Sequence, residues 1–212
     1  MTLPTLNKRP KNRQKIAIDI DDVLADNATG FVNFSNKTWG TTLQPEDYHE
    51  HWMELWNVDL VEAERRAIIL TNASIFKNYT HDEAALPVLK RLSADYDLCI
   101  VTSRREHTRD DTLAWIHQHY EGLFNDETIH YAGIWDKGIT LSGLSLTKAD
   151  VIAQLDADYL IDDQLKHCEG VAQTGRKALL FGNYKWNQVD ELPSGVTRVN
   201  DWAAVEEHFY GK

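Results

Sequence analysis

The fold of this chain is decided by residues 15–24, which read Lys15-Ile16-Ala17-Ile18-Asp19-Ile20-Asp21-Asp22-Val23-Leu24. A short apolar run, typical of a buried parallel strand, ends abruptly in two aspartates, Asp19 and Asp21, spaced i, i+2. Open α/β folds bind their ligands at the carboxyl ends of such strands. Because like charges at close range raise each other's pKa, a bound divalent cation would explain why two carboxylates stand together there. The stretch therefore predicts a ligand site at the end of the first strand.

Length and composition indicate an ordinary globular protein. The chain has 212 residues, 42% of them hydrophobic, which is enough for one substantial core with a smaller inserted domain. No apolar run approaches the length of a membrane span. Residues 1–14 are polar and lack the apolar centre of a secretion signal, so we expect a cytoplasmic protein with no membrane partner. Cys99 and Cys168 stand in or near apolar segments and are expected to be buried thiols rather than a disulfide.

Charge is unevenly distributed along the chain. Five basic residues and no acidic one precede Ile16: Lys8, Arg9, Lys11, Arg13 and Lys15. Residues 1–14 are therefore expected to form a flexible basic leader, with a nucleic-acid or membrane arm as the alternative. The formal net charge is nevertheless −11, so the remaining chain is strongly acidic. Such a body repels polyanions, and we expect no nucleic acid polymer among the partners.

Strand-like and helix-like patterns alternate along most of the chain. Strand-like runs stand at residues 16–18, 98–102, 128–132, 159–161, 178–181 and 196–199. Helical patterns fall between and after them, at residues 81–94, 108–119, 148–155, 164–173 and 201–209. This alternation favours a parallel sheet covered by helices on both faces, with all the strand carboxyl ends on one edge.

One connection, residues 25–79, interrupts this alternation. It has helical periodicity, no convincing strand and many aromatic residues, among them Trp52 and Trp56. Since a structureless loop of this length is improbable, we expect a small helical cap over the carboxyl edge of the sheet. The core domain would then comprise residues 15–24 and 80–212.

A second group of polar residues follows the apolar run at residues 98–102. This run ends at Thr102, and Ser103 and Arg104 come directly after it. A hydroxyl group at a strand end can donate a hydrogen bond to a phosphate oxygen, and a guanidinium group is well suited to phosphate recognition. For a lone threonine, a structural role is the alternative.

A lysine and a second pair of acids complete the candidate site. Lys148 stands near the start of a predicted helix, where a positive charge is unfavourable unless an anion lies nearby. Lys137 is the alternative lysine, although its sequence context is weaker. Asp162 and Asp163 end a third apolar strand, and carboxylate oxygens are ligands that Mg²⁺ prefers.

The order of these groups resembles the signatures of the haloacid dehalogenase (HAD) superfamily of phosphohydrolases. The resemblance implies a three-layer, Rossmann-like α/β fold with a small helical cap inserted after the first strand. It also implies that Asp19 is the nucleophile and Asp21 the general acid and base, with Thr102 and Lys148 as further catalytic residues. Dehalogenase chemistry is disfavoured, because members with that activity lack the second aspartate that Asp21 provides.

The resemblance also implies a bound Mg²⁺. Its ligands would be the Asp19 carboxylate, the Asp21 backbone carbonyl and one carboxylate of the pair Asp162 and Asp163. Which member of the pair is the direct ligand stays open. Asp22 stands where relatives often have glycine, so the backbone freedom of this turn is also open.

Within the superfamily, the chain is most similar to the cytosolic-type 5′(3′)-deoxyribonucleotidases. The similarity rests on residues 19–26, the helical segment and residues 161–163. That branch typically places an aromatic residue, used to stack the base, where this chain has Asn27. Trp52 and Trp56, spaced i, i+4, are candidate replacements, and packing in the core is the favoured alternative for such an aromatic stripe.

The expected function is therefore Mg²⁺-dependent hydrolysis of a small phosphorylated metabolite, with a (deoxy)nucleoside monophosphate as the specific candidate. Ser103 and Arg104 would help to bind it. One alternative is a non-catalytic protein of the HAD fold that binds a phosphorylated ligand or a protein partner. Another is phosphoryl transfer to an acceptor other than water. The oligomeric state cannot be predicted from this sequence.

Overall fold

The computed structural model of the chain describes residues 13–132 and 146–211. Most of the expected basic leader and the alternative lysine, Lys137, lie outside the described residues. Among the described residues, no helix is long and apolar enough to cross a membrane.

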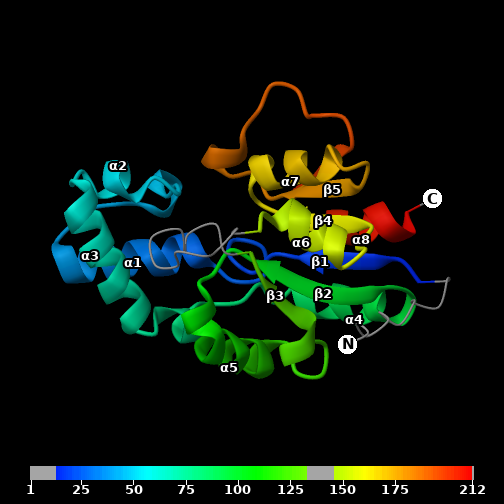
Figure 1. Cartoon of the computed structure of the whole chain (residues 1–212), viewed down its shortest axis with the longest axis horizontal. Helices are drawn as coiled ribbons and strands as arrows, with labels where there is room; N and C mark the ends of the chain where they lie inside the picture. The colour runs from blue at the N-terminus through cyan, green and yellow to red at the C-terminus, as the bar shows by residue number, and fades with distance from the viewer. Residues whose placement is uncertain (1–12, 133–145, 212) are drawn as a thin grey trace, which may run out of the picture.

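A six-stranded sheet forms the centre of the molecule (Figure 1). Its strands are β1 (Lys15–Ile18), β2 (Asp97–Thr102), β3 (Ile129–Tyr131), β4 (Tyr159–Asp162), β5 (Lys177–Phe181) and β6 (Val196–Val199). They lie in the order β3-β2-β1-β4-β5-β6, and every neighbouring pair is parallel. β1 is therefore central, with the carboxyl ends of β2 and β4 on either side of its own. This order brings the three polar groups predicted at strand ends to one edge.

Helices cover both faces of this sheet. They are α4 (Ala85–Asp95), α5 (Arg109–His119), α6 (Lys148–Gln154), α7 (Leu165–Ala172) and α8 (Trp202–Tyr210). In β1, Ile16 and Ile18 pack into the core that contains side chains of α4, α5 and α8, whereas Ala17 packs with those of α6 and α7. Both faces of β1 are therefore apolar, because a strand buried on two sides needs apolar residues at successive positions.

The long connection after β1 folds into helices rather than strands. It contains α1 (Asn27–Trp39), α2 (Trp52–Trp56) and α3 (Leu60–Asn72), with short 3₁₀ turns η1 (Pro45–Asp47) and η2 (Ile75–Asn78). These helices lie together beyond the carboxyl ends of the strands, at the left of Figure 1. An α/β/α core with a helical insertion after the first strand confirms the predicted fold class.

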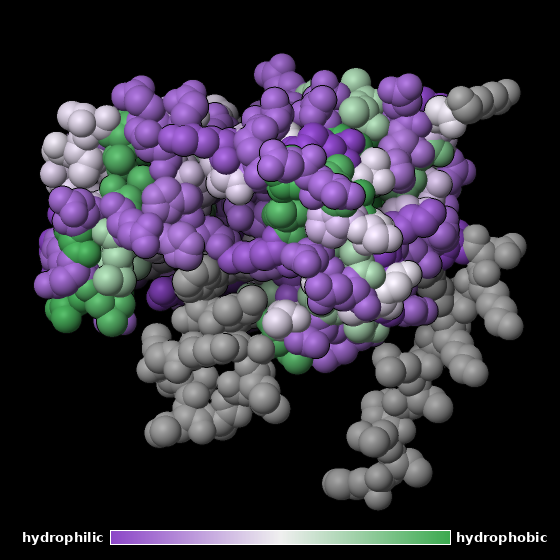
Figure 2. Space-filling model, turned by 90° about the horizontal axis from the view of Figure 1, so that it is seen from above, coloured by the Kyte–Doolittle hydropathy of each residue, from purple (hydrophilic) through white to green (hydrophobic). Residues whose placement is uncertain are grey.

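Aromatic packing holds the inserted helices together. The ring of Phe31 in α1 lies 5.1 Å from the Trp52 ring and 5.3 Å from the Trp56 ring of α2, and Trp39 meets Trp56 at 4.9 Å. Phe31 is almost fully buried, and burying a side chain of this size stabilises a fold by about 1.5–3 kcal/mol. Figure 2 shows apolar side chains at the surface of this end of the molecule as well; the exposed ones there include Met53, Leu60, Val61 and Ile68.

Cys99 in β2 and Cys168 in α7 are both buried, and they form no disulfide. Both side chains lie in the apolar layer between the sheet and the pair α6 and α7. The prediction of buried thiols is confirmed.

Candidate active site

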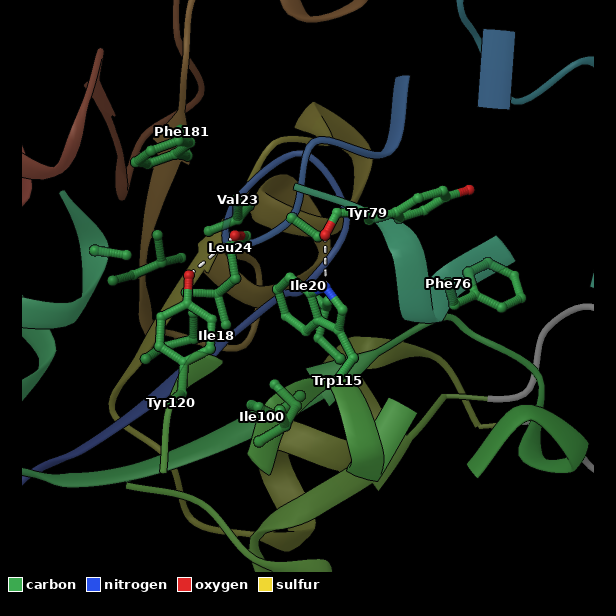
Figure 3. Packing of buried hydrophobic residues seen from close by; sticks show 14 of the residues in the cluster. Ile18, Ile20, Val23, Leu24, Phe76, Tyr79, Ile100, Trp115, Tyr120 and Phe181 are labelled. Atoms are coloured by element: carbon green, nitrogen blue, oxygen red, sulfur yellow. Dashed lines mark hydrogen bonds between the residues drawn. The ribbon is translucent and has the colours of Figure 1, made fainter. Parts of the chain in front are cut away.

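The turn after β1 is held in one conformation by hydrogen bonds from several elements. The Asp19 N–H donates to the Ile161 carbonyl at 2.9 Å, and the Tyr184 hydroxyl donates to the Asp22 carbonyl at 2.8 Å. The Tyr120 hydroxyl donates to the Leu24 carbonyl at 3.0 Å, and the Trp115 indole N–H fixes the end of the inserted segment by donating to the Tyr79 carbonyl at 2.8 Å (Figure 3). The acids of this turn are therefore presented on a rigid support.

Asp22 has a left-handed backbone, with φ of 58°. A residue with a Cβ is disfavoured in this region, which glycine adopts freely. Its buried carboxylate accepts hydrogen bonds from the Ala28 N–H at 2.9 Å and from the Asn27 amide at 3.0 Å. Burial raises the pKa of Asp22 to about 7, and these two hydrogen bonds oppose the rise. Asp22 thus joins the turn to the start of α1.

Lys148 connects the first and last predicted groups. Its Nζ lies 2.8 Å from the Asp19 carboxylate and 2.7 Å from the Asp162 carboxylate, and its side chain is only 1% exposed. It is the first residue of α6, and Thr147 caps that helix by accepting a hydrogen bond from the Asp150 N–H at 3.1 Å. Burial lowers the pKa of Lys148, but the two carboxylates outweigh burial and raise it above its ordinary value. The expected anionic neighbours of this lysine are therefore present.

Three carboxylates converge beside Lys148. Oxygens of Asp19, Asp162 and Asp163 lie within 4.8 Å of one another, and all three residues are buried. Burial raises the pKa of Asp19 to about 7, with Asp162 and Asp21 adding to the rise and Lys148 opposing it. Burial and the carboxylates of Asp162, Asp22 and Asp19 raise the pKa of Asp163 well above its ordinary value. Such a cluster needs further positive charge to hold all its groups ionised.

The two acids after β4 have different surroundings. Asp162 is fully buried, and its two oxygens accept from Lys148 and from the Gln164 N–H at 2.9 Å. Asp163 lines the cavity at this edge, and one of its oxygens accepts from the Gln164 amide and from the Trp186 indole, both at 2.7 Å. Asp163 therefore keeps an oxygen that none of these hydrogen bonds uses.

The hydroxyl residues after β2 also differ. Thr102 is fully buried, and its hydroxyl accepts a hydrogen bond from the Arg104 N–H at 3.2 Å. The Ser103 hydroxyl lines the cavity and is buried without a hydrogen-bond partner among the described residues. The Arg104 guanidinium is turned to Asp21, which its Nη2 approaches to 2.7 Å. The structure thus gives this arginine a carboxylate partner that the spacing in the sequence did not suggest.

A cavity of about 500 Å³ lies between the sheet edge and the inserted helices. Its walls include the acids Asp19, Asp21 and Asp163, together with Lys148. Five aromatic side chains also line it, those of Phe31, Tyr48, Trp52, Phe76 and Tyr79. This size is typical of a site for a small organic molecule, and the lining combines charged groups with aromatic side chains.

The two tryptophans proposed for base stacking lie in different places. Trp52 lines the cavity, and its buried indole N–H has no hydrogen-bond partner in the described parts of the chain. Trp56 is 5% exposed and is not among the cavity residues; its indole N–H donates to the Ser35 hydroxyl at 3.1 Å. Asn27 is buried, and its side-chain amide donates a hydrogen bond to Asp22 and so stabilises the turn after β1.

Several cavity residues were missed in the sequence. Tyr79 is 4% exposed, and within the part of the chain that the structure describes its hydroxyl has no hydrogen-bond partner. Burial raises the pKa of Tyr48 and of Tyr79 well above the ordinary value, so both hydroxyls stay protonated and can donate hydrogen bonds. Gln164 and His167, at the start of α7, line the same space. The aromatic content of residues 25–79 was the only signal for the tyrosines, and nothing in the pattern selects these two.

The sheet order, the acids at the strand ends and the helical insertion define a hydrolase fold of the HAD type. A haloacid dehalogenase-like family hydrolase from Streptococcus pneumoniae is similar, with a TM-score of 0.68, 16% identity and coverage of 93% of this chain and 98% of that one. A HAD family hydrolase from Deinococcus radiodurans with bound phosphate and sodium has a TM-score of 0.61 and 13% identity, and covers 93% and 95%. At this identity the likeness shows the fold alone.

The family is shown by the sequence itself. Residues 13–210 match the family described as "5′ nucleotidase, deoxy (Pyrimidine), cytosolic type C protein", and the chain belongs to this family. Proteins from two strains of Staphylococcus epidermidis, both named "Putative 5′(3′)-deoxyribonucleotidase", are 26% and 28% identical over 200 residues, which is 93% of this chain and 96% of theirs. The predictions of the family and of a phosphatase of the 5′-nucleotidase type are confirmed.

Proposed function

We propose that the protein is a Mg²⁺-dependent phosphomonoester hydrolase that works through an aspartyl phosphate on a small phosphorylated metabolite. The observation that carries the proposal is the Asp19 carboxylate. One of its oxygens is bound by Lys148, and the other is buried at the cavity with no hydrogen-bond partner among residues 13–132 and 146–211. A buried carboxylate oxygen left without a partner is costly in a purely structural role but is suited to attack on phosphorus.

The reaction has two steps. In the first, the Asp19 oxygen forms a bond to phosphorus, the bond to the leaving oxygen breaks, and that oxygen takes a proton from Asp21. In the second, a water molecule gives a proton to Asp21 and attacks phosphorus, which releases inorganic phosphate and the Asp19 carboxylate. The proton that Asp21 takes in one turnover is the proton it donates in the next, so the cycle balances.

The acids beside Lys148 suit a divalent cation. The oxygens of Asp19, Asp162 and Asp163 are close enough to share one, and hard oxygen ligands are those that Mg²⁺ takes. Because Lys148 and Gln164 already occupy the oxygens of Asp162, we assign the direct contact to Asp163, with Asp19 and the Asp21 carbonyl as the other protein ligands. A cation there would neutralise charge on the phosphoryl oxygens.

The chain's own donors would stabilise the remaining charge. Lys148 holds the nucleophile and offers its positive charge to the phosphoryl group. The buried Ser103 hydroxyl, which no other described residue binds, can donate a hydrogen bond to that group. Thr102 contributes by holding the backbone of the same loop, through its hydrogen bond with the Arg104 N–H. Preorganised donors of this kind act without reorganisation during the reaction.

A (deoxy)nucleoside monophosphate is the substrate that we favour. The aromatic side chains that line the cavity suit stacking on a flat base. The buried Tyr79 hydroxyl and Trp52 indole N–H suit hydrogen bonds to the polar edge of the base or to the sugar of the nucleotide. Residues 25–79 would then act as a cap that selects the leaving group, while residues 15–24 and 80–212 carry the chemistry. The family description as a cytosolic type supports a cytoplasmic location, which cell fractionation tests.

The test is phosphate release from a panel of phosphorylated metabolites that includes purine and pyrimidine 5′- and 3′-monophosphates. We expect release that needs Mg²⁺, stops with a chelator and falls at least about a thousandfold in Asp19→Asn. Full activity of Asp19→Asn would overturn the mechanism. A folded protein that binds Mg²⁺ but releases no phosphate across the panel would favour the non-catalytic alternative.

A further inference from the structure

Asp21 and Arg104 form an ion pair in which the guanidinium group contacts both carboxylate oxygens. The guanidinium Nε lies 3.1 Å and 3.0 Å from the two carboxylate oxygens of Asp21, and Nη2 lies 2.7 Å from Oδ1. Oδ1 therefore accepts from two N–H groups, and Oδ2 accepts from one. This fork fixes the plane of the carboxyl group as well as its position.

The arginine is enclosed, whereas the aspartate is open to the cavity. The Arg104 side chain is 1% exposed and that of Asp21 is 25% exposed. The guanidinium carbon lies 4.8 Å from the centre of the Phe76 ring and 5.9 Å from those of Tyr79 and Trp115. Phe76 and Tyr79 belong to η2 and the residue that follows it, whereas Trp115 comes from α5, and the Trp115 indole N–H donates to the Tyr79 carbonyl (Figure 3). The rings leave the guanidinium little room to change partner.

A further hydrogen bond fixes the far side of the guanidinium. Nη1 lies 3.4 Å from the Thr112 hydroxyl in α5. Arg104 thus connects the loop after β2 with α5 and with the residues that close the inserted segment. Because both sides of the guanidinium are occupied, a substrate phosphate would have to displace Asp21 to bind it.

We propose that Arg104 is a positioning residue for Asp21 and does not bind the substrate phosphate. This inference rests on the proposed function. By contacting both carboxylate oxygens, Arg104 holds the carboxyl group of Asp21 in one plane at the cavity. From there Asp21 gives its proton to the leaving oxygen as the bond from phosphorus to that oxygen breaks. Arg104 takes no proton and makes no bond to the substrate.

The role predicts an effect that depends on the leaving group. A nucleoside would leave as a strongly basic alkoxide unless its leaving oxygen receives a proton. Nitrophenolate is weakly basic and can leave without one. General acid catalysis typically contributes 10²–10⁴-fold. A disordered Asp21 should therefore impair hydrolysis of a nucleoside monophosphate and largely spare that of p-nitrophenyl phosphate.

The experiment compares kcat/KM for these two substrates, because this parameter covers only the steps through departure of the leaving group. In Arg104→Met with Mg²⁺ present, we expect a fall of about 10²-fold for the nucleoside monophosphate and less than about tenfold for p-nitrophenyl phosphate. The inhibition constant of inorganic phosphate should stay within about twofold. Arg104→Lys keeps the charge without the fork, should show the same selectivity, and serves if the methionine variant does not fold.

Two controls make the result specific. Arg105→Met removes the same charge from the same loop and should leave the ratio between the two substrates unchanged. Asp21→Asn should show the same selective loss as Arg104→Met, and combining the two substitutions should add no further selectivity.

Other outcomes overturn the inference. Equal losses on both substrates with weaker inhibition by phosphate would make Arg104 a phosphate ligand. Equal losses of kcat/KM on both substrates, with unchanged inhibition by phosphate, would show that Arg104 has a purely structural role. A wild-type protein that is inactive on both substrates would contradict the proposed function itself, before any Arg104 variant is compared.

Discussion

Two residues of the site, Asp22 and Lys148, are in states that are unfavourable by themselves, one through its backbone conformation and the other through burial of its charge. Asp22 has a left-handed backbone although it carries a Cβ, and a residue of that kind pays about 1–2 kcal/mol for it. Lys148 is buried, and it is stable there because Asp19 and Asp162 surround it. Both residues therefore lead to predictions about stability.

We expect Asp22→Ala to be less stable than Asp22→Gly by about 1 kcal/mol. Both substitutions remove the hydrogen bonds to Ala28 and Asn27, but only glycine relieves the strain of the positive φ. Urea unfolding of the two variants measures the difference. The control is Ala203→Gly at an exposed position in α8, where glycine should cost about 1 kcal/mol. Equal stability of the two Asp22 variants would contradict the argument.

Removing the charge in Lys148→Met should lower the free energy of unfolding by about 3–5 kcal/mol without added metal. The substitution leaves two buried carboxylates without their shared partner. Adding Asp162→Asn to it should recover part of the loss, because one of these charges is then removed. Chemical denaturation of the single and the double variant tests this, and a double variant less stable than the single one would count against it.

At the level of helices, the aromatic cluster between α1 and α2 contains one tryptophan that only packs in the core and one that also lines the cavity. Trp56 is buried against Phe31 and bonded to Ser35, whereas Trp52 also lines the cavity. Two neighbours on one short helix therefore serve different surfaces. The i, i+4 spacing predicted that they share a helix face, but spacing alone cannot say which neighbours that face meets.

Trp56→Ala should lower the free energy of unfolding by about 3–5 kcal/mol, while KM for the preferred substrate changes little in the folded protein. Trp52→Ala should cost less stability and raise KM. Steady-state kinetics and denaturant unfolding of the same preparations check both parts. If Trp56→Ala raised KM more than Trp52→Ala, the cavity boundary described above would be wrong.

For the molecule as a unit, stability and pH are linked through buried groups. Burial lowers the pKa of His167 to about 4, with the nearby lysines adding to this and Asp162 opposing it. The unfolded chain binds this proton near pH 6.5, so between these two values the unfolded state holds more protons. Stability contributed by neutral His167 is therefore lost as the pH falls from about 6.5 to 4. The raised pKa values of Asp19 and Asp22 act in the opposite direction, so the histidine must be isolated by difference.

We therefore expect the wild type to lose stability relative to His167→Gln as the pH falls from 7 to 4. The difference between their unfolding free energies should change by on the order of 3 kcal/mol. Denaturant unfolding at several pH values in the presence of chelator measures it. A difference that does not change with pH would show that His167 is exposed to water in the folded protein.

Local patterns in the sequence were sufficient for the architecture. Both faces of β1 are buried, so its apolar run and abrupt acidic end were visible in a few residues, and the alternation of strands and helices predicted the parallel sheet. Parallel topology alone then brings the ends of β1, β2 and β4 to one edge, which is why Asp19, Thr102 and Asp162 could be expected together. Each of these inferences depends on periodicity or on the direction of a strand.

Contacts between distant parts of the chain could not be predicted in this way. Arg104 meets Asp21 across 83 positions, and Trp186 meets Asp163 across 23. Whether Asp162 or Asp163 keeps a free oxygen, and whether Trp52 or Trp56 reaches the cavity, depends on side-chain packing and on competition for hydrogen-bond donors. These choices are made by the folded environment, because the energy of a buried charge or ring depends on which groups surround it and not on its neighbours in sequence.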